Sequence, residues 1–143
     1  MKNSEFKRIK QKIQQVDPIR WWGDDYDVRF YLVSKIKKIN HQMILDIGGG
    51  IGIISSEINS NNTRINVDFS FSDLVTCKNK VDSNIETVCA SMTNLPFIDG
   101  IFDSIICANI LEVGKSQDIK LNNIKQNNSI NYFPTVKNIL EDR

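Results

Sequence analysis

Cysteine, histidine and long apolar runs are all scarce in this sequence of 143 residues. The three cysteines, Cys77, Cys89 and Cys107, are an odd number at wide spacings, which favours buried, reduced thiols in a cytoplasmic protein over a disulfide framework or a zinc site. No apolar run approaches the roughly 20 residues of a membrane-spanning helix, and the basic N-terminus lacks the apolar segment of a signal peptide. We therefore expect no membrane segment and no metal site.

An excess of one charge is also missing. The 18 Lys and Arg residues face 17 Asp and Glu residues, for a formal net charge of +1. A chain this close to neutral gives no bulk electrostatic argument for binding nucleic acid. With 41% hydrophobic and 24% charged residues and no internal repeats, it has the balance of one small folded domain.

The sequence predicts two parts. Residues 1–40 are expected to form a helical cap, and residues 41–143 are expected to form the domain on which it packs. Over residues 4–16, apolar residues recur at three- and four-residue steps between basic ones, which predicts a surface helix docked on its own domain. Asp17-Pro18 ends that helix, and a second helix is expected over residues 27–39. The aromatic segment 21–26 between them is expected either to pack in the core or to close as a lid over a ligand.

Short apolar runs alternate with helical segments from residue 43 to residue 110. Continuous apolar strands in alternation with helices are typical of an α/β fold whose parallel sheet is covered by helices on both faces. The expected strands are 43–47, 64–68, 85–89 and 102–108, and the expected helices are 53–58 and 70–80, the latter capped by Ser70. The polar residues 114–131 are expected to form a loop or a loose helix, with a last helix after Pro134.

The clearest functional signal is the turn between the first strand and its helix, Asp46-Ile47-Gly48-Gly49-Gly50-Ile51-Gly52. Glycines let the backbone approach a ligand closely and adopt a positive φ, and this edge of a parallel sheet is where α/β proteins bind ligands. Asp68 ends the next strand, where a carboxylate can accept hydrogen bonds from two ribose hydroxyls.

Two nucleotide-binding patterns compete for this turn and fit it poorly. A phosphate-binding loop needs a glycine-rich run before Gly-Lys-Ser, but Gly114-Lys115-Ser116 has Asn109 at the required upstream glycine. A dinucleotide fingerprint, Gly-x-Gly-x-x-Gly/Ala, needs a small residue at its third conserved position. That position is Ile53 when the motif is counted from Gly48, and Ser55 when it is counted from Gly50. A nicotinamide-dinucleotide oxidoreductase stays open as a less favoured alternative.

A third pattern fits better, because Asp-Ile-Gly-x-Gly-x-Gly resembles motif I of the class I S-adenosylmethionine-dependent methyltransferases. Three later segments resemble the same family in order, close to its type 11-like branch: residues 66–70 its acidic second strand, residues 94–103 its Leu-Pro-Phe…Asp-x-x-Phe-Asp stretch, and residues 109–112 the end of its fourth strand. The resemblance implies a Rossmann-like fold and transfer of a methyl group from S-adenosylmethionine to a small-molecule acceptor.

The resemblance also implies a set of cofactor-binding residues. Asp46 and the backbone of the turn would hold the methionine end, Asp68 the ribose, and residues after the second, third and fourth strands the adenine and the sulfonium. The implied residues are Asp46, Gly48, Gly49, Gly50, Gly52, Asp68, Phe69, Ser91, Met92 and Asn109. Methyl transfer by in-line displacement chiefly needs alignment of donor and acceptor and exclusion of water.

Several departures from the family limit what the resemblance implies. Ser91 replaces an acid that accepts a hydrogen bond from the adenine amino group, and Val113 stands where a histidine is common. The single histidine, His41, precedes the first strand and is expected at the surface, so no catalytic base is predicted. A non-catalytic cofactor-binding remnant or partner subunit is therefore the alternative function.

The family's sheet has seven strands in the order 3-2-1-4-5-7-6, whereas only about four strands are predicted here. The chain is thus expected to be C-terminally incomplete, with the strand over residues 102–108 as an exposed apolar edge. Such an edge invites pairing with another copy or another protein, unless residues 114–143 fold over it.

Overall fold

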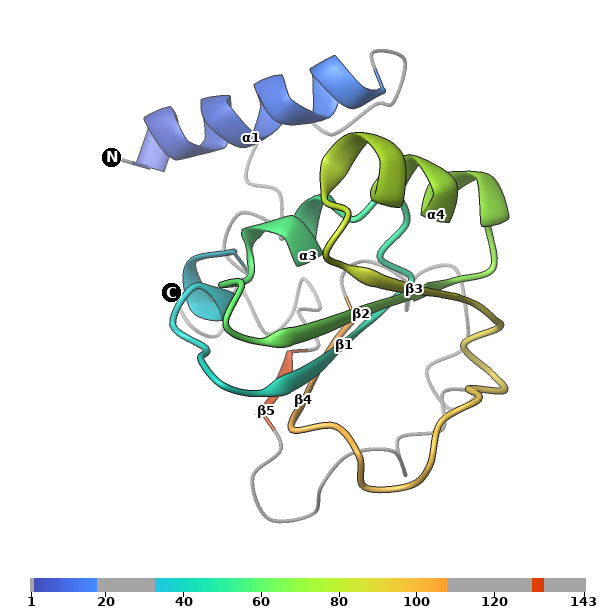
Figure 1. The fold of residues 1–143 in the computed structure, drawn as a ribbon. Helices are drawn as coiled ribbons and strands as arrows, with labels where there is room; N and C mark the ends of the chain where they lie inside the picture. The colour runs from blue at the N-terminus through green and yellow to red at the C-terminus, as the bar shows by residue number, and fades with distance from the viewer. Residues whose placement is uncertain (1, 18–32, 108–129, 133–143) are drawn as a thin grey trace.

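A computed structural model of the chain describes residues 2–17, 33–107 and 130–132 (Figure 1). The predicted lid over residues 21–26, the last helix after Pro134 and Asn109 lie outside these described residues. The other predicted elements can be compared with the structure wholly or in part.

The core of the molecule is a parallel sheet in the order β3-β2-β1-β4-β5. Its strands are β1 (Met43–Ile47), β2 (Thr63–Asp68), β3 (Glu86–Cys89), β4 (Ser104–Ile106) and β5 (Ile130–Tyr132). The apolar runs thus predicted the first three strands closely and the fourth too long. Because all the strands are parallel, the glycine turn after β1 lies at the same edge as the ends of β2 and β3 (Figure 1).

The fifth strand corrects the prediction of an exposed edge at β4. Ile130–Tyr132 pairs in parallel with β4, and Ser104 lies opposite Ile130 in this register. Of the expected arrangements, the one observed is therefore that in which the C-terminal segment covers the fourth strand. Pairing of β4 with another chain is not available at this edge.

Two apolar clusters fill the two faces of the sheet. One contains Ile44 of β1 and Ile106 of β4, and it packs against the helices α1 (Lys2–Val16) and α3 (Ile53–Glu57) and against residues 33–39. The other contains Leu45 and Ile105 and packs against the segment that links β3 to β4. In the described part of the chain, α1, α3 and α4 (Phe71–Thr76) lie on the same side of the sheet, while a loop covers the other side (Figure 1).

The start of the helical segment agrees with the prediction, and its end at Val81 lies one residue beyond the predicted one, but its last turn is of a different type. Ser70 caps the helix by accepting a hydrogen bond from the Asp73 backbone N–H, as the Ser-x-x-Asp pattern predicts. The helix then widens into a π-helical turn over Cys77–Val81, which periodicity did not reveal. Cys77 and Cys107 are buried as predicted, whereas Cys89 is exposed.

The described residues hold neither a bilayer-length apolar helix nor a cluster of metal-binding side chains. None of the described helices combines the length and hydropathy that crossing a bilayer requires. No three His, Cys, Asp or Glu side chains gather around a common point in the same residues.

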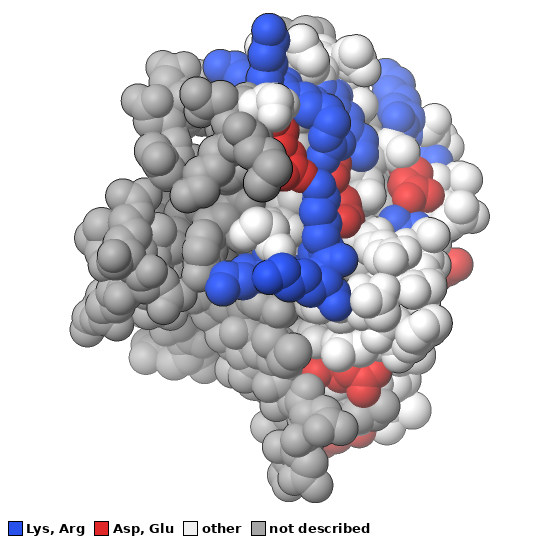
Figure 2. Space-filling model, turned by 90° about the vertical axis from the view of Figure 1, so that its left-hand side faces the viewer, with Lys and Arg blue, Asp and Glu red and all other residues white. Residues whose placement is uncertain are grey.

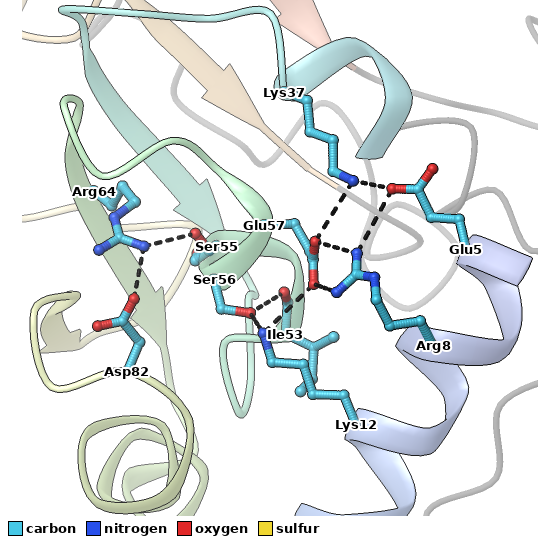
Figure 3. A network of polar contacts seen from close by, with 10 residues as sticks. All are labelled: Glu5, Arg8, Lys12, Lys37, Ile53, Ser55, Ser56, Glu57, Arg64 and Asp82. Carbon is cyan, nitrogen blue, oxygen red and sulfur yellow. Dashed lines mark hydrogen bonds and ion pairs between the residues drawn. The ribbon is translucent and has the colours of Figure 1, made fainter.

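The first helix docks on α3 through both apolar and ionic contacts, as its periodicity predicted. Ile9 and Ile13 are buried in the core cluster. Figure 2 shows basic side chains, with acidic ones between them, on the side of the molecule where the helix begins. Figure 3 shows how Arg8 and Lys12 converge on Glu57, the last residue of α3, at 2.7 Å and 3.4 Å.

Glu57 is the centre of this ionic cluster, and its side chain is only 6% exposed. Burial alone would raise the pKa of Glu57, but the hydrogen bonds from Arg8 and the positive charges of Lys12, Arg8 and Lys37 together lower it below its ordinary value. Lys37 also bonds Glu5 of α1, so residues 33–40 join the same cluster. The carboxylate therefore fastens two segments onto α3.

Replacing Glu57 by glutamine should lower the free energy of unfolding by about 1–3 kcal/mol, because the cations around it lose their common partner. Urea unfolding measured at low and high salt would show the loss shrinking as salt screens the wild-type cluster. Glu86→Gln is the matched control, since the Glu86 side chain is 68% exposed and lies 3.7 Å from Lys78, and its loss should be below about 1 kcal/mol. Equal losses in the two variants would contradict the central role of Glu57.

Candidate cofactor site

The turn after β1 has the backbone conformation that its glycines predict. Gly48, Gly50 and Gly52 have φ values of 68°, 55° and 82°, which non-glycine residues rarely adopt. Gly48 donates its N–H to the Val67 carbonyl at 2.7 Å, and Gly52 begins α3 as its N-cap. The chain thus leaves the sheet and enters the helix within one compact turn, supported by β2.

Asp68 at the end of β2 is tied directly to the glycine turn. Its Oδ2 accepts the Gly50 N–H at 2.9 Å, and its Oδ1 accepts the Ser70 N–H at 2.8 Å. A carboxylate has about four lone-pair positions, so each oxygen can still accept a further hydrogen bond. The half-buried side chain is thus fixed between two backbone donors while keeping acceptors for a ligand.

Gly49 lies where no side chain fits. A Cβ at this position would be 2.3 Å from Asn66 Oδ1 and 2.6 Å from Asp46 Oδ2. Gly52 is similarly restricted, because its Cβ would be 2.4 Å from the sulfur of the buried Cys77. The glycines at these two positions are therefore required by the packing beneath the turn as well as by any ligand above it.

Asp46 lies beneath the turn, where it is 2% exposed. Its Oδ2 accepts a hydrogen bond from the Ser55 hydroxyl at 2.6 Å, which ties β1 to the first turn of α3. Burial raises the pKa of Asp46 to about 7, the Ser55 hydrogen bond opposes this rise, and the negative charge of Asp68 adds to it. Asp46 is therefore a carboxyl group that changes protonation near neutral pH.

Ser55 is itself held from β2. Arg64 is buried, and its guanidinium donates to the Ser55 carbonyl at 3.3 Å and to Asp82 at 2.8 Å (Figure 3). The helix that follows the glycine turn is thus fixed from below by a side chain of the neighbouring strand. This support could not be predicted from the sequence, because its partners are separated along the chain.

The residues expected to contact adenine follow β2 and β3, and the structure brings their backbones together. Asp68 pairs with Cys89 across the two strands, and Ala90 donates its N–H to the Asp68 carbonyl at 3.1 Å. Phe69 is 82% exposed where the chain leaves β2. Ser91 is exposed and its hydroxyl contacts that of Thr93 at 2.8 Å, and Met92 is half-buried against the core.

Asn66 is the residue of this edge that the sequence analysis missed as part of the site. It is fully buried in β2, and its amide donates to the Gly50 carbonyl at 2.9 Å. Its sequence signal is weak, because Asn66 is a polar residue between the apolar Ile65 and Val67 in a strand that also contains Thr63, Arg64 and Asp68. His41, which precedes β1, is exposed, as predicted.

Residues 44–126, more than half of the chain, match the family described as Methyltransferase domain. No match to a curated protein is found. Among solved structures, a Methanococcus maripaludis protein assigned to the S-adenosyl-L-methionine-dependent methyltransferases is similar with a TM-score of 0.60 and 15% identity. The match covers 91% of this chain and 61% of that one.

Two further solved structures share the fold. A Clostridium acetobutylicum S-adenosylmethionine-dependent methyltransferase has a TM-score of 0.53 and 21% identity, over 90% of this chain and 53% of that chain. Haemonchus contortus phosphoethanolamine N-methyltransferase 2, solved with S-adenosyl-L-methionine, has a TM-score of 0.58 and 17% identity, over 80% of this chain and 30% of that one. The chain thus spans less than two thirds of the length of each of these structures.

Proposed function

This chain belongs to the methyltransferase domain family, and from that membership we propose that it is an S-adenosylmethionine-dependent methyltransferase acting on a small-molecule acceptor. One observation carries the proposal beyond the family match. The glycine turn and the ribose-type carboxylate are joined by a hydrogen bond of 2.9 Å between the Gly50 N–H and Asp68. The sequence places these two residues at the same end of the sheet, and the contact between them supports the proposal that they form one site.

The described residues fit the chemistry of S-adenosylmethionine. Asp68 keeps lone pairs for the ribose hydroxyls, and Phe69 offers an exposed ring on which an adenine can stack. Ser91 and Met92 follow the neighbouring strand β3, and we assign them to the edge of the adenine. The backbone of residues 48–52, with no side chain at Gly49, holds the methionine end from above Asp46.

When bound, S-adenosylmethionine supplies a methyl group on a positively charged sulfur, from which an acceptor atom can displace it. The work of this chain is then to orient the cofactor and exclude water, since no protein nucleophile is required. Asp68 fixes the sugar while its own position is set by the N–H groups of Gly50 and Ser70. Asn109, which follows β4, is part of the same proposal as the residue nearest the sulfonium.

The N-terminal segment has a place in this proposal as well. Residues 1–40 form a cap on the cofactor-binding part from residue 41 onward. The support is that α1 docks on α3, the helix that starts at the glycine turn, through Arg8 and Glu57. The aromatic segment 21–26 of this cap is the proposed lid.

Calorimetric titration with S-adenosylhomocysteine and, separately, with NAD tests the proposal. We expect binding of S-adenosylhomocysteine and none of NAD. Asp68→Ala should weaken that binding by about 1–3 kcal/mol, which is roughly 5- to 150-fold, and Asp68→Asn, which keeps one carbonyl acceptor, should weaken it less. The thermal midpoint of each variant, measured alongside, separates lost affinity from lost folding.

Binding of NAD alone would overturn the methyltransferase proposal in favour of an oxidoreductase. A folded wild-type protein that binds neither compound would favour the non-catalytic partner subunit, for which the uncharged Ser91 is the supporting observation. Wild-type affinity in the Asp68→Ala variant would mean that the ribose does not bind at the end of β2.

A further inference from the structure

Gly50 is held on both of its backbone groups by side chains of a single strand. Its N–H donates to Asp68 and its carbonyl accepts from the Asn66 amide, each at 2.9 Å. Residues 66 and 68 are two apart on β2, so the alternation of a strand places both side chains on the same face. The conformation of the turn is therefore set by two polar residues of the neighbouring strand.

Asn66 and Gly49 also fit each other sterically. A Cβ on Gly49 would lie 2.3 Å from Asn66 Oδ1 and 2.8 Å from its Cγ. The asparagine side chain, together with Asp46 Oδ2 at 2.6 Å, thus fills the volume in which a side chain at residue 49 would have to lie. Because Asn66 is fully buried, it cannot swing into solvent to make room.

Burial of this amide in the middle of a strand is costly in itself. Its Oδ1 finds no hydrogen-bond donor among the residues that the structure describes, and an unpaired buried acceptor destabilises a fold. An apolar β-branched residue would be the usual occupant of such a position in a buried parallel strand. Stability alone therefore does not account for asparagine here, whereas control over the Gly50 carbonyl does.

We propose that Asn66 is a positioning residue of the cofactor site, matched to the missing side chain at Gly49, and that it sets the turn in the conformation that binds the methionine end of S-adenosylmethionine. This inference rests on the proposed function. Asp68 contacts the ligand and the turn, while Asn66 acts on the ligand only through the backbone of residues 49–50. The pair of Gly49 and Asn66 is then a unit in which changing one member requires changing the other.

The test measures affinity for S-adenosylhomocysteine by calorimetry, at a temperature at which each variant is folded. Asn66→Ala should weaken binding about tenfold, because the Gly50 carbonyl loses its donor and the turn loses its fixed conformation. Gly49→Ala should weaken binding at least as much, because the new methyl group overlaps the Asn66 amide. The double variant should bind more tightly than Gly49→Ala alone, since the closer overlap, with Asn66, is removed and only that with Asp46 Oδ2, at 2.6 Å, remains.

Asn62→Ala is the matched control. Asn62 is also buried, and its amide donates to the Ile39 carbonyl at 2.8 Å, but it lies just before β2, at the opposite edge of the sheet from the turn. It should lower the thermal midpoint and leave the affinity unchanged. If Asn66→Ala does not fold, Asn66→Thr is used in the same measurement, because threonine has a higher strand propensity than alanine.

The possible outcomes separate the two proposals. Wild-type binding together with unchanged affinity in both Asn66 variants would overturn the positioning role and leave the proposed function standing. Losses that simply add in the double variant would overturn the matched pair. A folded wild-type protein without affinity for S-adenosylhomocysteine would overturn the proposed function, and this inference with it.

Discussion

Replacing Gly50 by valine is expected to weaken the binding of S-adenosylhomocysteine by about a hundredfold or more. Gly50 has a φ of 55°, a conformation that a β-branched residue adopts only under strain. To relieve the strain, the two peptide groups of this residue would rotate. They would then lose the hydrogen bonds to Asp68 and from Asn66, each 2.9 Å long. A combined loss of about 3 kcal/mol or more corresponds to roughly a hundredfold weaker binding.

Gly100→Val provides the control for this variant. Gly100 has a φ of 73°, and a Cβ there would meet nothing within 4 Å. Four residues later the chain enters β4, so this glycine lies at the opposite edge of the sheet from the turn. The control should lower the thermal midpoint and keep the affinity. Equal loss of affinity in both variants, or wild-type affinity in Gly50→Val, would mean that the ligand does not lie against Gly50.

The sequence predicted the bounds of β1 and β2 more closely than those of β4. Met43–Ile47 agrees with its prediction at both ends, and β2 differs by one residue. Ile44 and Leu45 are both fully buried although they point to opposite faces, which is why this strand has no apolar–polar alternation. A strand buried on both faces leaves the chain few other ways to fold.

The elements that were missed depend on contacts between distant segments. β5 lies beyond the polar residues 114–128, where no alternation marks it, and it exists as a strand because β4 pairs with it. β4 was predicted over residues 102–108 but pairs as a strand only over Ser104–Ile106. Phe102 contributes instead to packing, with its ring 5.0 Å from that of Phe97 and nearly perpendicular to it.

The candidate site divides in the same way. The glycine turn and Asp68 could be predicted because the function proposed for them requires particular residue types at the ends of two strands. Asn66 and Ser55 could not, because each acts through a hydrogen bond whose partner is 16 or 9 residues away. A polar residue inside a buried strand is a signal that something must pair with it, but the sequence does not say what.

Raising the pH from 5 to 8 is expected to destabilise the ligand-free protein through Asp46. The pKa of Asp46 is raised from 3.8 to about 7 in the folded state, so between these values the folded protein keeps a proton that the unfolded chain has lost. The stabilisation that the retained proton gives the folded state is fully present below about pH 4 and is lost as the pH rises to about 7. At 1.36 kcal/mol per unit of pH, the loss between pH 5 and 7 is about 3 kcal/mol.

Other groups near Asp46 do not obscure this loss. The thiols of Cys77 and Cys107 both have pKa values raised mainly by burial, that of Cys107 to about 12, so they stay neutral across the range. Glu57 and Asp82 have lowered pKa values and therefore titrate below this pH range. Asp68 faces Asp46 as a negative charge, and its repulsion is one reason why the proton is retained.

Urea unfolding of the wild type and Asp46→Asn at pH 5, 6, 7 and 8 isolates the effect, because every other titrating group is common to both proteins. The amide keeps an oxygen that accepts the Ser55 hydrogen bond but cannot ionise. We expect the two proteins to have similar stability at pH 5 and the variant to be more stable by about 3 kcal/mol at pH 8. Parallel curves across this range would mean that Asp46 is already ionised beneath the turn at pH 5, which would require a cation or a further donor to reach it there.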